Sequence, residues 1–213
     1  MNASKSDGNH RYDIVGPAQS AATIDLIGRV FSRDEPLAVT VGQSREEFTR
    51  MLAVFLPAAL SDHLTMGAFT GGKMVGVALT TAFTFAPPAE IEGMSPNYPP
   101  IGALIAALEQ DYERANAERL DRCAHIHMLA VDNHARGHGI AQALVDATAR
   151  NAKRNGYDTI LSDATNPTSQ RVFARQGFRT ANEVAYSTFE HDGTARFASL
   201  ANLGAIKLME KRI

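Results

Sequence analysis

The sequence predicts an α/β protein with a mixed sheet that is covered by helices on both faces. Strand-like and helical segments alternate through the second half, and this alternation requires at least one parallel crossover. A glycine pair between two β-rich stretches predicts an antiparallel hairpin in the first half. Apolar residues make up 45% of the 213 positions, enough for one ordinary core, so a disordered or fibrous chain is excluded.

The first predicted helices are defined by apolar spacing, a capping box and proline. One helix covers about residues 19–31 and cannot continue past Pro36, which leaves Asp34 and Glu35 at the end of an element. A second helix begins at the capping box of Ser44, and Pro57 bends or ends it. The hairpin follows within residues 64–85, with its turn at Gly71-Gly72.

The remaining elements follow from proline content and from a change of hydrophobic period. Five of the nine prolines lie between residues 86 and 100, so this stretch is predicted to be an irregular loop. Apolar positions at helical spacing then predict a helix from Ile101 to Tyr112. Further on we expect strand 124–131, a glycine-rich turn 136–141, helix 140–155, strand 159–162, helix 167–175, a strand from Phe178 and a closing strand 205–210.

Charge and cysteine content restrict the partners and the compartment. The 21 Lys and Arg residues against 23 Asp and Glu give a net charge of −2 without a basic stripe, which argues against nucleic acid and favours a small ligand. The single Cys123 excludes an internal disulfide and fits a reducing compartment. Residues 51–60 are apolar but far shorter than the roughly 18 that a membrane span needs. We expect a loose tail over residues 1–10, one domain over residues 11–213, and a cytoplasmic protein.

The turn between Val131 and the helix that starts at Ile140 carries the strongest chemical signal. Gly137 and Gly139 let several backbone N–H groups point at one spot, and the helix dipole adds positive charge there. This arrangement favours a phosphate, to which Arg136 can add charge-assisted hydrogen bonds. A P-loop is disfavoured because Gly-Lys-Ser/Thr is missing, and a dinucleotide fingerprint because Gln142 replaces its third glycine. A purely structural turn is the alternative.

On two motifs the chain resembles the GNAT superfamily of acyl-CoA-dependent N-acetyltransferases. Arg136-x-x-Gly139-x-Ala141 is similar to the coenzyme A loop of that family and directly follows a Leu-Ala-Val strand end. The segment from Asn166 through Ser169 and Phe173 to Gly177-Phe178 looks like the family's Asn…Tyr-x-x-x-Gly-Phe segment. The two matches together cover residues 124–179.

The resemblance implies a three-layer αβα fold with a mixed, mostly antiparallel sheet that is splayed at the coenzyme A site. It also implies acetyl-CoA as cosubstrate, a small amine as acceptor, and no metal. Pantetheine would pair with the free main-chain groups of the splayed strand, as an added strand does. The implied coenzyme contacts are Leu129, Ala130, Val131, Arg136, Gly137, His138, Gly139, Ile140, Ala141, Asn166, Ser169 and Phe173.

Amine acetylation needs a base, because a primary amine with a pKa near ~10 is mostly protonated at neutral pH. His125 and His127 lie at i and i+2 of a strand, hence on one face, and imidazoles suit this task. Their strand resembles that of arylalkylamine N-acetyltransferases, which implies a proton relay. Glu35 precedes a proline as in insect dopamine-type members, which implies a second candidate base. Two interior histidines and a solvated acidic helix end are the alternatives.

The acid that protonates the departing thiolate is less well defined. Phe173 stands where the family usually has a proton-donating tyrosine, so Ser169, Thr165 or water must substitute. A thiol pKa near ~8.5 makes the thiolate a tolerable leaving group without a strong acid. The resemblance implies the Leu129 N–H as the donor to the oxyanion. Cys123 is expected to pack in the core and not to carry the acyl group.

Two other classes of function stay open. One is a metal site on the His125-x-His127 pair with His134 and His138 nearby, although no carboxylate completes a recognised motif. The other is an acyl-CoA sensor that binds without catalysis. For an enzyme, the acceptor is an arylalkylamine, a peptide, a polyamine or an antibiotic; Phe83, Phe85 and Tyr98 are candidates for an apolar wall. We expect part of residues 86–122 to cover the acceptor site, and a homodimer is not excluded.

Overall fold

The described residues form a seven-stranded mixed sheet, as the sequence predicts. The structure is a computed structural model that describes residues 10–91 and 93–213, so the expectation of a loose N-terminal tail falls almost wholly outside them. The strand order is β1-β2-β3-β4-β5-β7-β6. The strands are β1 (Arg11–Ile14), β2 (Met66–Thr70), β3 (Lys73–Ala82), β4 (Cys123–Val131), β5 (Thr159–Ala164), β6 (Arg179–Ala185) and β7 (Ala205–Arg212).

The first four strands form an antiparallel half-sheet. The predicted hairpin joins β2 to β3, and its two turn residues Gly71 and Gly72 have φ values of +56° and +80°. Side chains rarely adopt such values, which explains the glycine pair. The hairpin prediction is therefore confirmed.

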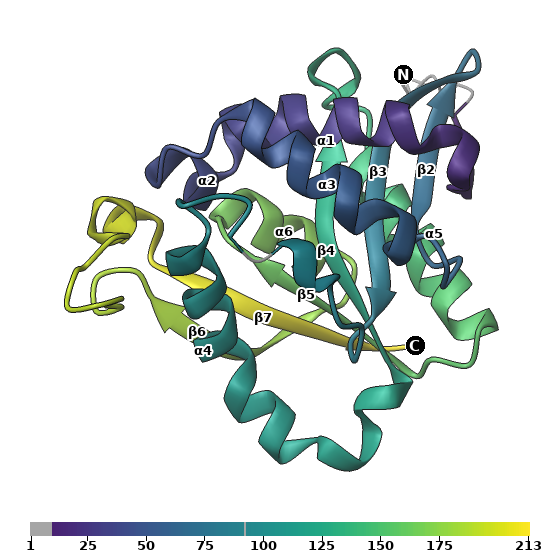
Figure 1. Cartoon of the computed structure of the whole chain (residues 1–213). Helices are drawn as coiled ribbons and strands as arrows, with labels where there is room; N and C mark the ends of the chain where they lie inside the picture. Colours follow the sequence, from purple (N-terminus) through teal and green to yellow (C-terminus); the bar gives the residue numbers. More distant parts are fainter. Residues whose placement is uncertain (1–9, 92) are drawn as a thin grey trace, which may run out of the picture.

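The sheet opens between β4 and β5. These two strands are parallel, but they pair only from Cys123 to Ile126 and from Thr159 to Ser162. Beyond this point β4 stays paired with β3 as far as Val131, so it diverges from β5 (Figure 1). The splayed sheet is thus confirmed, and it places the last residues of β4 beside an open gap.

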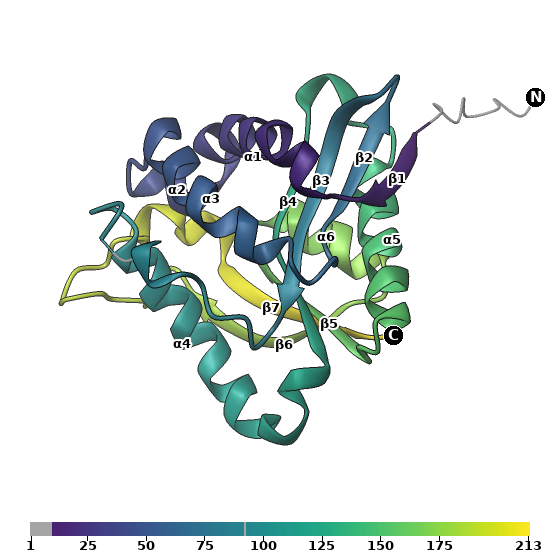
Figure 2. The ribbon, with the colours of Figure 1, turned by 45° about the vertical axis from the view of Figure 1, so that its right-hand side comes forward.

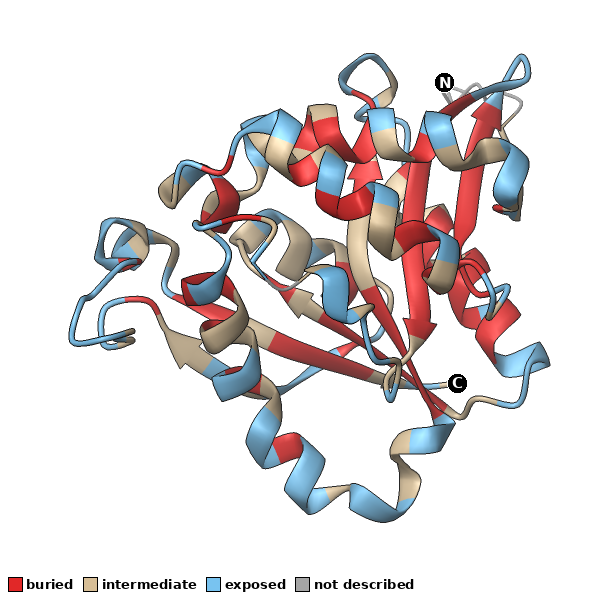
Figure 3. Cartoon of the chain, viewed as in Figure 1, coloured by how far each residue is buried: buried red, intermediate tan, exposed pale blue. Residues whose placement is uncertain are grey.

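Six α-helices of the described chain cover the sheet. They are α1 (Ser20–Asp34), α2 (Pro36–Thr40), α3 (Arg45–Ala59), α4 (Pro99–Ala115), α5 (Ile140–Arg154) and α6 (Pro167–Arg175). The views in Figures 1 and 2 place α1 and α3 on one face of the sheet and α5 and α6 on the other. Helix α4 packs against β6 and β7. Figure 3 shows the buried residues concentrated where helices meet strands. No described helix combines the length and the apolar character that a membrane span requires.

The region around Pro36 differs from the prediction. Helix α1 continues to Asp34, three residues beyond the expected end at Phe31, and Pro36 opens the short helix α2. Proline suits the first position of a helix because its missing N–H has no partner there in any case. Glu35 caps α2 by accepting a hydrogen bond from the Ala38 N–H at 2.6 Å. The predicted element end is confirmed. The break between α1 and α2 holds Glu35 between the two helices.

A β-bulge at His127 changes which side of the sheet the later side chains of β4 face. Ile126 pairs with Thr80 and Met128 with Leu79, so His127 is the extra residue. Ile126 packs in the core under α5, whereas Met128 packs in the core under α1 and α3. The bulge therefore reverses which residues face each side of the sheet. His125 and His127 still lie together, with ring centroids 4.4 Å apart, as predicted.

Candidate active site

A cavity of about 1140 Å³ lies where β4 and β5 separate. Its wall is built from α1, α2 and α3, from the second half of β4, from the starts of α5 and α6, and from the segment before and within α4. Pro87, Ile91 and Tyr98 belong to this wall. The expectation that part of residues 86–122 covers the site agrees with this placement.

At one end of the cavity the turn before α5 presents unpaired backbone N–H groups. Gly137 and Gly139 have φ values of +84° and +78°, and a Cβ on either would meet open space. Gly139 is the N-cap of α5 and supplies no side-chain acceptor, so the first-turn N–H groups stay uncapped. Gly137, Gly139 and Ala141 line the cavity. Among the described residues, no protein group occupies the place of an anion in front of this turn.

Arg136 holds the turn by its side chain. Its Nη2 forms an ion pair with Asp34 at 2.6 Å, and its Nε donates to the Val131 carbonyl at 3.3 Å. Hydrogen bonds from Arg33 and then Arg136 lower the pKa of Asp34 to about 2. Arg136 therefore joins the end of α1 to the end of β4, and it also lines the cavity together with Arg175.

Two of the residues predicted to contact coenzyme A lie outside the cavity lining. Ala130 is fully buried and packs in the core under α1 and α3. His138 is exposed, and its ring lies against the carbonyls of Ala135 and Arg136. The described cavity wall includes the other ten predicted contacts: Leu129, Val131, Arg136, Gly137, Gly139, Ile140, Ala141, Asn166, Ser169 and Phe173.

The start of α6 forms the opposite wall of the same end. Asn166 caps α6 through hydrogen bonds from the N–H groups of Thr168 and Ser169. The Ser169 hydroxyl donates to the Asn166 carbonyl at 2.9 Å, so its hydrogen is already engaged. Phe173 is 2% exposed and packs on Phe178 with ring centroids 5.0 Å apart.

The end of β4 offers main-chain groups to the gap. The Asp132 N–H bonds to the Val75 carbonyl on β3, so Val131 directs its N–H and C=O away from β3. By the alternation of a strand, Leu129 directs its groups the same way. The Val131 carbonyl accepts from Arg136 Nε, and the other groups form the edge that the resemblance requires of a pantetheine-binding strand.

Glu35 lies in the cavity wall with a buried carboxyl group. Its Oε1 has no hydrogen-bond partner in the described part of the chain. Burial raises the pKa of Glu35, against the opposing effects of hydrogen bonds from Ala38, Leu37 and Thr165. A carboxyl with a raised pKa and an unpaired oxygen, on a residue that lines a cavity, has the properties of a general base.

The two histidines have different environments. Burial and then the neighbouring His125 lower the pKa of His127 well below its usual value, so His127 is neutral. Because the Thr81 hydroxyl donates to the Ala82 carbonyl, it accepts from His127 Nε2 at 2.8 Å and leaves Nδ1 unprotonated. Burial alone would lower the pKa of His125, but Asp163 and Glu109 outweigh it and raise that pKa.

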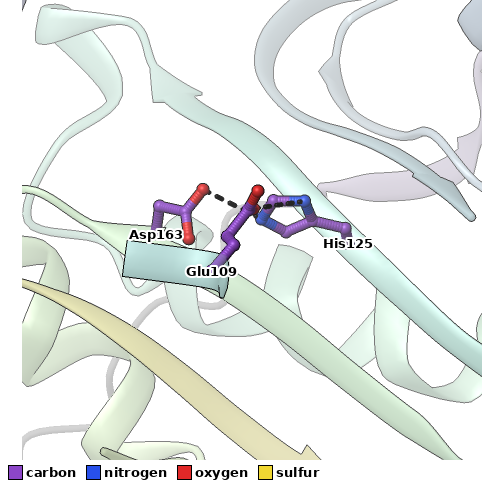
Figure 4. Close-up of side chains that lie close together, drawn as sticks. All are labelled: Glu109, His125 and Asp163. Carbon is purple, nitrogen blue, oxygen red and sulfur yellow. Dashed lines mark ion pairs between the residues drawn. The ribbon is translucent and has the colours of Figure 1, made fainter. Parts of the chain in front are cut away.

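Two acidic residues that the sequence analysis missed flank His125. Asp163 Oδ2 lies 3.2 Å from His125 Nε2, and Glu109 Oε1 lies 3.7 Å from His125 Nδ1 (Figure 4). Burial, followed by the nearby Asp163, raises the pKa of Glu109 to about 8. No local pattern announces this cluster, since Glu109 comes from α4, His125 from β4 and Asp163 from β5.

The cluster also bears on the predicted metal alternative. Within the described residues, Glu109, His125 and Asp163 form the one group of three potential ligands whose ligand atoms lie within 4.8 Å of one another. It contains neither His127 nor His134 or His138. The four-histidine site considered from the sequence is therefore wrong in its composition.

The acceptor end of the cavity has aromatic walls. Phe83, Phe85 and Tyr98, which the sequence analysis singled out, all line it. Phe55 adds a fourth ring, 5.4 Å from Phe85 and 5.6 Å from His127 between ring centroids. Cys123 is buried and free, which agrees with a packing role.

Comparison with known proteins shows which family and which solved structures the chain resembles. Residues 97–194 match the family described as acetyltransferase (GNAT) domain. Arylalkylamine N-acetyltransferase 2 from Aedes aegypti superposes with a TM-score of 0.81 at 23% identity, over 96% of this chain and 99% of that one. The C-terminal condensation domain of Ebony, solved with beta-alanyl-dopamine, gives 0.86 at 14% identity, over 96% and 99%.

A third structure is polyamine N-acetyltransferase from Drosophila melanogaster, which catalyses the formation of N-acetylagmatine. It superposes with a TM-score of 0.73 at 16% identity, over 96% of this chain and 100% of that one. At such identities the three likenesses establish the fold, and the family match covers the loop, α5 and α6 that build one end of the cavity. Over residues 97–194 the chain is therefore similar to a GNAT acetyltransferase domain.

Proposed function

We propose that the protein transfers the acetyl group of acetyl-CoA to a primary amine by direct attack within a ternary complex. The observation that carries this proposal is the row of uncapped N–H groups at the start of α5, which faces the same cavity as the buried carboxyl of Glu35. A helix N-terminus with two glycines is suited to a diphosphate. A carboxyl with a raised pKa is suited to remove a proton from an ammonium.

In this proposal the diphosphate binds the amides from Gly137 to Ala141, with Arg136 and Arg175 close by. Pantetheine pairs with the main chain of Leu129 and Val131 in the gap beside β5. Ala130 and His138 contribute backbone only, because their side chains point elsewhere. Asn166, Ser169 and Phe173 line the opposite wall.

The acetyl transfer balances without a further reactant. The acceptor enters as an ammonium and loses one proton to Glu35, either directly or through water. The amine nitrogen then attacks the thioester carbonyl carbon, a C–N bond forms, and the Leu129 N–H donates to the oxyanion. As the intermediate collapses the C–S bond breaks, the nitrogen loses its second proton, and the thiolate takes up one proton. The products are the amide, free coenzyme A and one proton.

His127 is assigned a relay role and the thiolate needs no dedicated acid. Neutral His127, with Nδ1 free, accepts a proton and passes it on, whereas His125 is occupied by two carboxylates. Ser169 donates to the Asn166 carbonyl and is therefore a weak candidate for the acid. With a thiol pKa near ~8.5, the thiolate leaves at neutral pH and takes its proton from water.

The acceptor is assigned to the arylalkylamines. Four aromatic side chains, Phe55, Phe83, Phe85 and Tyr98, surround the acceptor end and suit an aryl ring. Two of the superposed structures also concern aryl-type ligands, an arylalkylamine acetyltransferase and a complex with beta-alanyl-dopamine.

The test is a free-thiol assay with acetyl-CoA and a panel of arylalkylamines, polyamines and peptide N-termini. We expect thiol release that depends on both substrates and is strongest with arylalkylamines. Acetyl-CoA binding without thiol release for any amine would instead support the sensor function. No acetyl-CoA binding at all would contradict both.

A further inference from the structure

The cluster of Glu109, His125 and Asp163 places two largely buried acidic groups around one imidazole. Neither acidic group forms an ion pair with a lysine or arginine within the described residues; both lie beside His125 and close to each other. A single imidazolium can balance one of the two carboxylates. Burial, followed by the nearby Asp163, raises the pKa of Glu109 to about 8, so the second carboxyl keeps its proton unless a cation takes the place of that proton.

Polar atoms of the cluster are also left without partners. His125 is 3% exposed, and its Nε2 forms no hydrogen bond of acceptable geometry. Asp163 Oδ1 is likewise buried and unpaired within the described residues. Figure 4 shows the three side chains, from three different elements, pointing toward one another. Buried polar groups normally find partners, so the unpaired Asp163 Oδ1 indicates a missing donor.

The cluster belongs to the cavity but lies away from the reacting end. Glu109, His125 and Asp163 all line the cavity together with Glu35. His125 and Leu129 pair with Thr81 and Ala78, which are three residues apart on β3 and therefore about 10 Å apart along the strand. A ligand that places one nitrogen beside Leu129 and Glu35 therefore extends its other end toward the cluster.

Aromatic rings flank the acidic groups. The Phe83 ring lies 5.5 Å from the His125 ring between centroids, and burial, followed by the charges of Glu109 and Asp163, raises the pKa of Tyr98. Ring faces and carboxylates together favour an organic cation. A metal ion is the competing occupant, because one ligand atom from each of the three residues lies within 4.8 Å of the others, although the shortest carboxylate contacts are to opposite ring nitrogens, Nδ1 and Nε2.

We propose that Glu109, His125 and Asp163 form a subsite for a second cationic group of the acceptor, an ammonium or guanidinium at the end remote from the reacting amine. This inference rests on the proposed function and makes it more specific. The preferred acceptors are diamines with an apolar or aryl centre. The distal cation donates to Glu109 and to Asp163 Oδ1, while the aromatic walls hold the centre.

The experiment compares two acceptors of the same shape, para-xylylenediamine and para-ethylbenzylamine, which differ in whether the distal group is an ammonium or a methyl. After correction for its two equivalent amines, the diamine should have a kcat/KM at least about tenfold higher, mainly through KM, as expected for one charge-assisted contact. In Glu109→Gln and in Asp163→Asn this preference should fall close to one. Glu113→Gln, which removes an exposed charge one turn further along α4, should retain it.

Calorimetric titration of both amines into the chelator-treated protein supplies a readout that does not need catalysis. The diamine should bind more tightly than the monoamine, and Glu109→Gln should abolish the difference while circular dichroism confirms the fold. Equal binding of the two amines by the wild type would overturn the proposed subsite. A preference for the diamine that survives in both Glu109→Gln and Asp163→Asn would overturn it as well. A preference that appears only after zinc is added would assign the cluster to a metal instead. Diamine binding without acetylation of either amine would retain the subsite and contradict the proposed function.

Discussion

The two ends of the cavity are built in different ways. The anion-binding part of the coenzyme end consists of backbone groups from one continuous segment, residues 136–141, and Arg136 and Arg175 line the cavity beside it. The acceptor end consists of side chains from separate elements, with Glu35 between α1 and α2, Glu109 on α4 and Asp163 on β5. The coenzyme end is exposed, basic and built from residues that are neighbours in sequence. The acceptor end is buried, acidic and built from residues that only the fold brings together.

This difference explains what each end can do. Backbone amides at a helix start recognise a phosphate whatever the neighbouring side chains are, so one loop serves a common cosubstrate. Buried carboxylates instead have strongly shifted pKa values, as the rise at Glu109 illustrates, and they discriminate between ligands by charge. We therefore expect changes at the first end to alter coenzyme affinity, and changes at the second end to alter rate, acceptor choice and pH response.

The largest expected effect lies at the acceptor end. Glu35→Gln keeps an acceptor for the Ala38 N–H but removes the base, so kcat should fall about 100-fold or more. Coenzyme A affinity should stay unchanged, as measured by calorimetry. Glu46→Gln, an exposed glutamate at the start of α3, is the matched control. A Glu35→Gln enzyme with near wild-type kcat would remove Glu35 from the mechanism.

At the coenzyme end the decisive variant is Gly139→Ala. A Cβ there would project into the space reserved for the diphosphate, and the Kd for coenzyme A should rise about tenfold. Gly156→Ala is the control, because Gly156 also has a positive φ of +89° but follows the other end of α5, outside the cavity wall. Both variants should lose roughly 1 kcal/mol of stability from backbone strain. If both weakened coenzyme binding equally, strain and not contact would be the cause.

The acidic end should also make stability depend on pH. The folded-state pKa of Glu109, about 8, lies above its ordinary value of 4.5, so the fold favours the protonated form. The contribution of Glu109 to the free energy of unfolding is complete below about pH 4.5 and is lost as pH rises through about 8. His125 acts in the same direction, since its pKa is raised as well. The groups that face Glu109 are Asp163, His125 and, along α4, Glu113.

The thermal unfolding midpoint of the wild type should therefore fall by a few degrees between about pH 5 and about pH 8. Glu109→Gln should flatten this decrease, and Glu113→Gln should leave it in place. The check is a series of thermal scans at constant ionic strength. A wild-type curve as flat as that of Glu109→Gln would mean that Glu109 is not held in its protonated form.

The smallest expected effect is at Phe173, which lines the cavity next to the coenzyme end. Phe173→Tyr would restore a hydroxyl at the position where the family resemblance expects an acid. Because the thiolate leaves without strong assistance, kcat should change less than about threefold. An increase well beyond that would mean that thiolate protonation limits the wild-type rate.

The fold was largely predictable because its signals are local. The capping box of Ser44 and Glu47 is present, the Gly71-Gly72 hairpin forms, and α6 has the predicted bounds of Pro167–Arg175. The coenzyme loop, residues 136–141, was predictable for the same reason, since its glycines and the helix that follows are neighbours in sequence. Helix α2 was missed because Pro36 was interpreted only as a stop, although proline also starts helices.

The acceptor end was only half predictable. Glu35, His125 and His127 were found through motifs, but Glu109 and Asp163 meet His125 only once α4 and β5 are in place. The bulge at His127 leaves no sequence signal, yet it turns Met128 and Ala130 toward α1 and α3. Interactions between residues far apart in sequence depend on strand register and helix packing, and a single sequence does not specify these.

The central claim is that the amides at the start of α5 bind the diphosphate of acetyl-CoA. A crystal structure of the protein with coenzyme A tests it most directly. The claim predicts diphosphate oxygens within hydrogen-bond distance of the N–H groups between Gly137 and Ala141, with pantetheine beside Leu129 and Val131. A diphosphate bound elsewhere, with those N–H groups in contact with water alone, would contradict it.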